Sequence, residues 1–273
     1  MSTPTPLIPR EGWHVMHLFY QIDHSQWQCL SQEEQRSAKT RMTQLVQEIR
    51  STPDTHLLTY AIATPKADIG FMLLTPDLQV ANAFEKRLTL SLGPDILNAC
   101  YSYLSQTEAS EYTTTSEQYI EETLIGEKGL TRGTTEFDTA LKEFEDRMAH
   151  YLKHRLYPVL PDWPAICFYP MSKRRSGNDN WYSLDYKARR ELMAGHARVG
   201  RTYSGRILQL ITGSTGLDEY EWGVTLLAKD TMDIKAIVYE MRFDEVSARY
   251  AEFGDFYIGM QLPLDELFRR VCL

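Results

Sequence analysis

Hydrophobic and polar positions follow two periods along the chain, and both halves use them in the same order. Apolar residues at every second position predict strands, and a recurrence at i, i+3, i+4 and i+7 predicts helices. The elements expected in the first half are strands at 12–23, 56–64 and 68–75 and helices at 31–51 and 77–88. Ser31 and Glu34 have the spacing of a capping box, which favours a helix start at that point.

The second half repeats this order. Its expected elements are strands at 165–173, 205–212 and 221–228 and helices at 185–199 and 230–243. The best internal match pairs 68–77 with 221–230 and aligns Gly70 with Gly223. A repeated order of strand, helix, strand, strand and helix predicts an α+β fold of two tandem ferredoxin-like domains.

A polar stretch near residues 107–135 separates the two halves and is expected to be a loop or flap with little core. We therefore expect an N-terminal domain over 1–135 and, over 136–273, a linking helix followed by the C-terminal domain. The apolar stripe of that helix leads to Arg155 at its end. An arginine in this position either extends toward solvent or faces an anionic ligand.

Composition and charge remove several classes of function. The 273 residues carry a net charge of -8, which disfavours nucleic acid and anionic membrane as partners. No apolar run is long enough to span a membrane, and the first residues lack the pattern of a signal peptide. The four cysteines show no metal-like spacing, so free thiols in the cytoplasm are expected.

Polar residues occur where the periodicity expects core. Period two places Tyr169, Met171 and Lys173 on one face of the 165–173 strand. Gln209 lies in an apolar row of the next strand. It is either a core amide that is hydrogen-bonded to backbone or a residue that contacts a ligand. His196 faces the apolar side of its helix, where it is either a core residue or an axial ligand of haem iron.

The region from Lys173 to Arg206 is basic in an acidic protein. It contains nine Lys or Arg residues against three acidic residues. Such an island favours a small polyanionic ligand over a long polymer. Arg174 and Arg175 either touch this ligand or are solvated surface charges.

Four motifs in this order resemble one known family. They are YPMSKRR followed by NWY, then ELMAGHARVGRTYSG, GSTGLDEYEWGVTL and YEMRFDEVSARYAEFG. Together they are similar to the coproheme decarboxylases of the chlorite dismutase-like superfamily, which are hydrogen-peroxide-dependent haem synthases. The resemblance implies two ferredoxin-like domains of the dimeric α+β barrel type, a porphyrin site in the C-terminal domain, and a homopentamer.

The resemblance also implies a role for each matching residue. Tyr169 matches the catalytic tyrosine, Lys173 the lysine near the first reacting propionate, and His196 the proximal iron ligand. The positions expected to hold or line the porphyrin are Arg155, Met171, Trp181, Gln209, Arg242 and Ser247. Chlorite dismutases proper resemble one another in a distal arginine, and Gln209 at this position argues against oxygen release from chlorite.

The implied reaction converts iron-coproporphyrin III (coproheme) into haem b with hydrogen peroxide as the oxidant. Each reacting propionate loses a β-hydrogen to a tyrosyl radical and then carbon dioxide, which leaves a vinyl group. A transient contact with the ferrochelatase that supplies coproheme is also expected. The alternatives are a haem carrier or sensor without turnover, a chlorite dismutase-like peroxidase, and an α+β oligomer without a cofactor.

Overall fold

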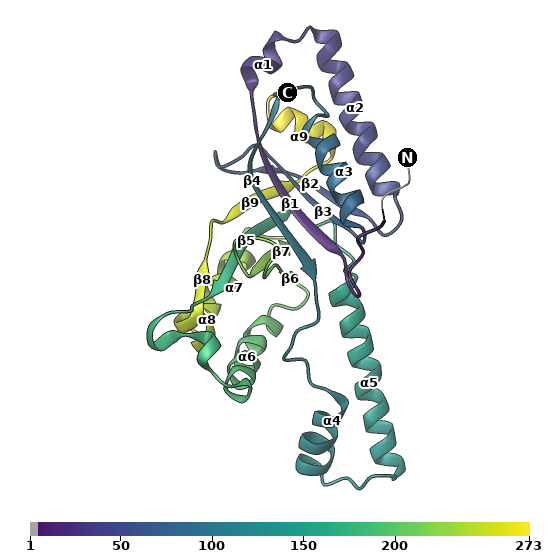
Figure 1. Ribbon diagram of the computed structural model, residues 1–273, viewed down its shortest axis with the longest axis vertical. Coiled ribbons are helices and arrows are strands. Elements are labelled where there is room, and N and C mark those ends of the chain that lie inside the picture. The colour runs from purple at the N-terminus through teal and green to yellow at the C-terminus, as the bar shows by residue number, and fades with distance from the viewer. Residues whose placement is uncertain (1–4) are drawn as a thin grey trace. The chain divides into compact units, whose positions relative to one another are not determined.

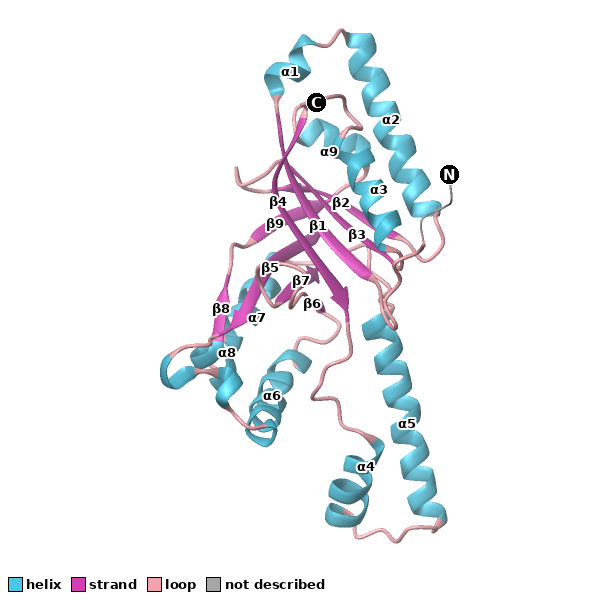
Figure 2. Cartoon of the chain, viewed as in Figure 1, coloured by secondary structure: helices cyan, strands magenta, loops and turns pink. Residues whose placement is uncertain are grey.

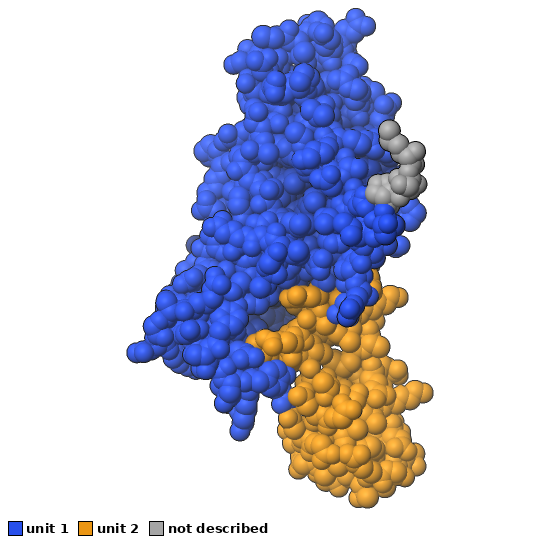
Figure 3. All heavy atoms as spheres, viewed as in Figure 1, with its two compact units in different colours: residues 1–107, 161–273 blue, residues 108–160 orange. Residues whose placement is uncertain are grey.

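The computed structural model describes residues 5–273, which form two compact units (Figures 1 and 3). Of the described residues, 5–107 and 161–273 form one unit, and 108–160 form the other. The domain boundary expected near residue 135 stays a prediction.

From residue 5 onward, the N-terminal half of the first unit contains four strands and three helices. Figure 2 shows them in magenta and cyan. They are β1 His14–Ile22, α1 His24–Cys29, α2 Gln32–Ser51, β2 His56–Ile62, β3 Ile69–Thr75, α3 Leu78–Thr89 and β4 Leu97–Thr107. The capping box expected at the start of α2 is present, because Ser31 accepts from the Glu34 N–H and Glu34 accepts from the Ser31 N–H.

The C-terminal half repeats this arrangement with more short elements. They are β5 Ala165–Lys173, η2 Gly177–Asp179, η3 Trp181–Ser183, α6 Tyr186–Arg201, β6 Ile207–Gly213, β7 Trp222–Ala228, α7 Thr231–Met241, α8 Glu245–Tyr250, β8 Ala251–Phe253, β9 Tyr257–Gln261 and α9 Leu264–Arg270. The sequence analysis identified neither β4 nor β9. Three successive residues near the start of β4 are exposed, and its buried positions include Ser105 and Thr107, so the apolar alternation that marks a strand is weak.

The strand order confirms the predicted α+β fold of two ferredoxin-like halves. The first half is ordered β4-β1-β3-β2, and the second half is ordered β6-β7-β5-β9. The pairs β2–β9 and β4–β6 join the halves, so every strand except β8 lies in one closed antiparallel ring. Because a closed ring has no free edges, the barrel fixes which face of each strand points inward.

Aromatic side chains fill the barrel interior. Phe168 of β5 contacts His17 and Phe19 of β1, at ring centroid distances of 4.0 and 5.7 Å, although β5 and β1 do not pair. The His17 side chain also lies 2.8 Å from the Thr225 hydroxyl on β7. Burial lowers the pKa of His17 to about 3, so this histidine is neutral at every physiological pH.

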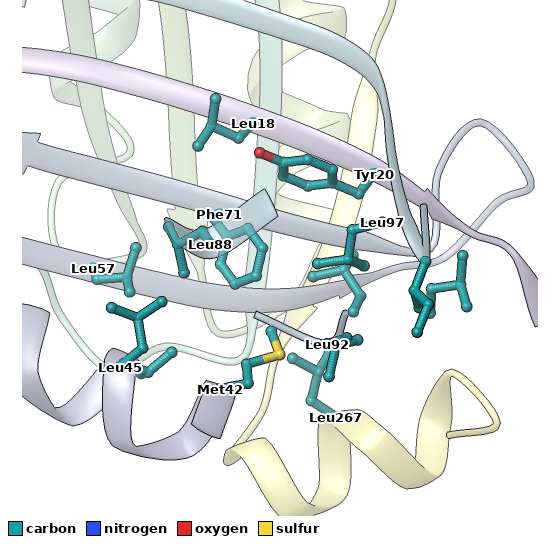
Figure 4. Close-up of a cluster of buried hydrophobic side chains, with 14 of the residues drawn as sticks. Leu18, Tyr20, Met42, Leu45, Leu57, Phe71, Leu88, Leu92, Leu97 and Leu267 are labelled. Carbon is teal, nitrogen blue, oxygen red and sulfur yellow. The ribbon is translucent and has the colours of Figure 1, made fainter. Parts of the chain in front are cut away.

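Helices cover the outer face of each half. On the N-terminal half, α2, α3 and α9 bury an aliphatic and aromatic core that includes Met42, Phe71 and Leu267 (Figure 4). On the C-terminal half, Ile234 and Ile237 of α7 pack on Leu226 of β7. No helix among residues 5–273 is long and apolar enough to cross a membrane.

The second unit contains α4 Ser116–Gln118, the π-helix η1 Tyr119–Glu127 and the long helix α5 Thr135–Leu156. The loop expected for the polar stretch is therefore partly helical. The reason is local packing: Tyr119 stacks on Phe144 of α5 at a centroid distance of 3.9 Å, and Leu124 is fully buried.

Gly70 of β3 gives a test of the barrel packing. A Cβ at this position would overlap the ring of Tyr60, which is buried on the neighbouring strand. We expect Gly70→Ala to lower the free energy of unfolding by about 1–3 kcal/mol, measured by urea denaturation. Gly195→Ala on α6 is the control, because its Cβ would meet open space or ordinary contacts, and it should stabilise the helix by roughly 0.5–1 kcal/mol. Equal stability of the Gly70→Ala variant and the native chain would contradict this packing.

Candidate functional site

Successive side chains of β5 point alternately into the barrel and toward its outer face. Phe168 points inward, whereas Cys167 and Tyr169 join the core cluster of the outer face. Pro170 lies in the middle of the strand, where the partner strand changes from β9 to β8. A residue without an N–H is tolerated at such a change of partner, so β5 continues to Lys173.

Tyr169 lies in an apolar and aromatic setting. Its side chain is 6% exposed, stacks on Phe256 at 4.4 Å and meets Phe253 edge-on at 5.7 Å. Burial raises the pKa of Tyr169 above its usual value, and the positive charge of Arg242 only partly opposes this rise. The phenol therefore keeps its proton at physiological pH and can donate it, or a hydrogen atom, to a neighbouring group.

Lys173 is the last residue of β5 and lies on the same face as Tyr169. Its side chain is a buried cation. Its Nζ lies 4.9 Å from the ring centroid of Trp181, which is itself buried. Burial lowers the pKa of Lys173 to about 8, and the carboxylates of Asp244 and Glu221 oppose this shift. Lys173 is therefore largely protonated at neutral pH although it is withdrawn from water, which suits the binding of a carboxylate.

Glu221 fixes the end of β5 from the neighbouring loop. Its Oε2 accepts the Lys173 backbone N–H at 2.7 Å, and the residue is 6% exposed. The sequence analysis did not select Glu221, because its importance depends on the pairing of β5 with β7. The only available signal was an acidic residue directly before an apolar strand.

His196 of α6 is held by Asp244, which begins α8. The distance from His196 Nδ1 to Asp244 Oδ2 is 2.8 Å, and the Ser247 hydroxyl donates to the same oxygen at 2.9 Å. Burial tends to raise the pKa of Asp244, but the hydrogen bonds from His196 and Ser247 outweigh it and lower this pKa. Asp244 is thus ionised and can only accept, so Nδ1 donates to it, and in the neutral tautomer Nε2 is the nitrogen with the free lone pair.

This pairing is typical of a histidine that ligates a metal through Nε2. No hydrogen-bond partner of Nε2 is found among residues 5–273. Asp244 is not among the residues predicted from the sequence, and the signal that could have pointed to it is an Asp directly before Glu, Val and Ser, a pattern that suits a helix cap. That it contacts His196, 48 residues away, is a consequence of the packing of α8 on α6.

Gln209 of β6 lies against α6, the helix that carries His196. A Cβ on Gly200, one helical turn after His196, would lie 3.1 Å from Gln209 Nε2. None of the sixteen residues of α6, all of which the structure describes, is buried, although the helix is amphipathic. Its apolar side, with Leu192 and Met193, is thus only partly covered by protein.

Met171 and Arg242 lie around the same outer face. Met171 packs against the cluster that contains Tyr169, and the Arg242 guanidinium lies 5.4 Å from the ring centroid of Phe253. A hollow of about 510 Å³ opens between α7 and the strands β5 and β9, lined in part by Cys167, Phe256 and Arg242.

Arg155 belongs to the second unit (Figure 3). It lies near the end of α5, and its Nε donates to the backbone carbonyl of Glu108 at 2.9 Å. Its expected contact with a porphyrin propionate stays a prediction.

The basic island is partly neutralised. Arg174 lies 3.7 Å from Asp179 and 3.5 Å from Glu252, and Arg175 is 4.0 Å from Glu221 while 68% of its side chain is exposed. Both arginines therefore have the contacts of surface charges, one of the two interpretations of the sequence.

The charge balance around Lys173 can be measured in the protein without a ligand. In the native chain, NMR of ¹³C-methylated lysines should show Lys173 titrating near pH 8. Glu221→Gln keeps an acceptor for the Lys173 N–H but removes a negative charge, so the pKa of Lys173 should fall further. Glu252→Gln, an exposed partner of Arg174, should leave it unchanged. A Lys173 pKa near the ordinary 10.5 in the native chain would show that the ammonium is not buried.

The chain is similar to a known protein family over most of its length. The family model of chlorite dismutase matches residues 35–262. A solved structure described as a heme-binding protein from Thermus thermophilus is 36% identical, with a TM-score of 0.80, and the match covers 99% of this chain and 100% of that chain.

More distant structures share the fold. A mutant of chlorite dismutase from Candidatus Nitrospira defluvii is 17% identical with a TM-score of 0.72, and the match covers 97% of both chains. The putative chlorite dismutase TA0507 is 16% identical with a TM-score of 0.67, covering 94% of this chain and 97% of that chain. With a family model that spans most of its length and a full-length relative of 36% identity, the chain belongs to the chlorite dismutase-like family.

Proposed function

We propose that this chain is a hydrogen-peroxide-dependent decarboxylase that converts coproheme into haem b. The observation that carries the proposal is the shared face of β5, where a buried neutral phenol, Tyr169, and a buried ammonium, Lys173, lie four residues apart. Neither a haem carrier nor a sensor needs this pair, whereas radical transfer next to a bound carboxylate needs both.

The residues fit an iron porphyrin. His196 offers Nε2, and Asp244 holds the other ring nitrogen. The half-buried apolar side of α6 and the outer face of the sheet suit a flat apolar ring, and Lys173 and Arg242 suit its carboxylates. When bound, the iron porphyrin supplies the redox chemistry with peroxide.

Each decarboxylation balances as one propionate, one peroxide and one proton giving a vinyl group, carbon dioxide and two waters. Two electrons leave the substrate: the β-carbon loses a hydrogen atom and the bond to the carboxylate carbon breaks. In our proposal the Tyr169 oxygen, as a radical, takes the hydrogen atom from the β-carbon. Lys173 holds the departing carboxylate, and the apolar stack of Phe253 and Phe256 keeps water away from the radical.

The other site residues complete the proposal. Trp181 supports the Lys173 ammonium, and Ser247 supports Asp244. Met171 and Gln209 would line the porphyrin pocket, and Arg155 would bind a propionate. The same proposal places the chain in the cytoplasm as a homo-oligomer, a pentamer by family resemblance, with transient access to the ferrochelatase that supplies coproheme.

A second candidate is a haem-binding protein without turnover. It is favoured by the description of the Thermus relative as a heme-binding protein. The two candidates separate in one experiment, in which ferric coproheme is added to the chain and peroxide is titrated. The first predicts two successive losses of carbon dioxide by mass spectrometry, and the second predicts bound coproheme that survives excess peroxide.

Tyr169→Phe tests the radical step. This variant keeps the aromatic stack but has no O–H, so it should bind ferric coproheme as the native chain does and lose decarboxylation. Binding is followed by the Soret band and turnover by mass spectrometry. Tyr239→Phe, on an exposed tyrosine of α7, is the control and should retain full turnover. Turnover by Tyr169→Phe at the native rate would remove Tyr169 from the proposed role.

Asp244→Asn tests the support of His196. An amide accepts more weakly than a carboxylate, so Nε2 should become a poorer donor to iron, with affinity for ferric coproheme falling about 10- to 100-fold. Resonance Raman spectra of the ferrous complex should show a lower iron–histidine stretching frequency. Ser247→Ala should shift this frequency less, because it removes only a neutral donor from Asp244. An unchanged frequency in Asp244→Asn would show that His196 is not the iron ligand or is not tuned by Asp244.

A further inference from the structure

The long helix α5 carries two histidines that the proposed function does not use. His150 and His154 lie four residues apart, both are exposed, and their rings meet edge-on with centroids 4.3 Å apart. Residues at this spacing lie on the same helix face, so the contact is a direct consequence of helix geometry.

Two imidazoles one helical turn apart can bind one metal ion together. Imidazole nitrogen is a preferred ligand of Cu²⁺, Ni²⁺ and Zn²⁺, and a pair of histidines at i and i+4 is the spacing that zinc motifs use on a helix. The helix supplies the order that chelation requires: α5 is 22 residues long, and the Thr134 hydroxyl caps its start.

The surrounding charges decide how strong such a site is. His154 lies in the last turn of α5, where the negative end of the helix dipole favours a cation. Asp146, one turn before His150, adds negative charge, whereas Arg147 and Lys153 oppose it. No group of three or more His, Cys, Asp or Glu side chains suited to a metal occurs in the described part of the chain, so protein supplies only the pair.

We propose that His150 and His154 form a surface site for one borderline divalent cation, with water completing its coordination. Cu²⁺ binds most tightly, because it stands highest among the divalent first-row metals for nitrogen ligands. The site is separate from His196 in sequence and belongs to the unit of residues 108–160.

Titration of the full chain, without porphyrin, with Cu²⁺ tests the proposal. Calorimetry should show one site per chain, and electron paramagnetic resonance should show two coordinating nitrogens. His150→Ala and His154→Ala should each weaken this site at least about tenfold, because even the loss of an outer-shell partner costs 10- to 100-fold in metal affinity. Both positions are exposed, so circular dichroism should show unchanged helix content. If helix content falls, His150→Gln and His154→Gln replace the alanine variants.

His196→Ala is the control that separates this site from the proposed iron ligand. It should keep the Cu²⁺ site and its two-nitrogen signal. Native affinity in the double variant His150→Ala and His154→Ala would overturn the proposal. So would loss of the two-nitrogen signal in His196→Ala, since the bound copper would then depend on α6.

Discussion

The candidate site depends on the register of β5 in a closed barrel. Phe168 is fixed inside the barrel by its stacking on His17, and this contact forces Tyr169 onto the outer face. A slip of one residue would exchange the two side chains and bury Lys173 in an aromatic interior. Packing inside the barrel therefore also fixes the direction of every functional side chain on β5.

Two arrangements of charged side chains then complete the outer face: Lys173 is buried, and the His196–Asp244 pair is half-buried. The Lys173 ammonium lies against the Trp181 ring and is affected electrostatically by Asp244 and Glu221, and His196 donates to Asp244. Asp244 links them, because it bonds to His196 and acts electrostatically on Lys173. A ligand that binds to one arrangement therefore changes the electrostatic environment of the other, as the low polarity of a buried site leaves such charges poorly screened.

The sequence alone was enough to predict the directions of the main site residues. Alternation placed Tyr169 and Lys173 on one strand face, and helical periodicity turned His196 inward. The sequence did not predict β4, because buried positions of this strand are occupied by Ser105 and Thr107. It did not predict the roles of Asp244 and Glu221 either, because their partners lie on other elements. Periodicity reports the direction of a side chain within its element, but a contact between elements depends on their packing.

The proposed function requires one face of the C-terminal half to bind an iron porphyrin between α6 and the sheet. A crystal structure of the chain with ferric coproheme tests it most directly. We expect iron bound to His196 Nε2, with Nδ1 still hydrogen-bonded to Asp244, and a propionate within reach of Tyr169 and Lys173. A porphyrin bound elsewhere, or with iron held by another residue, would contradict it.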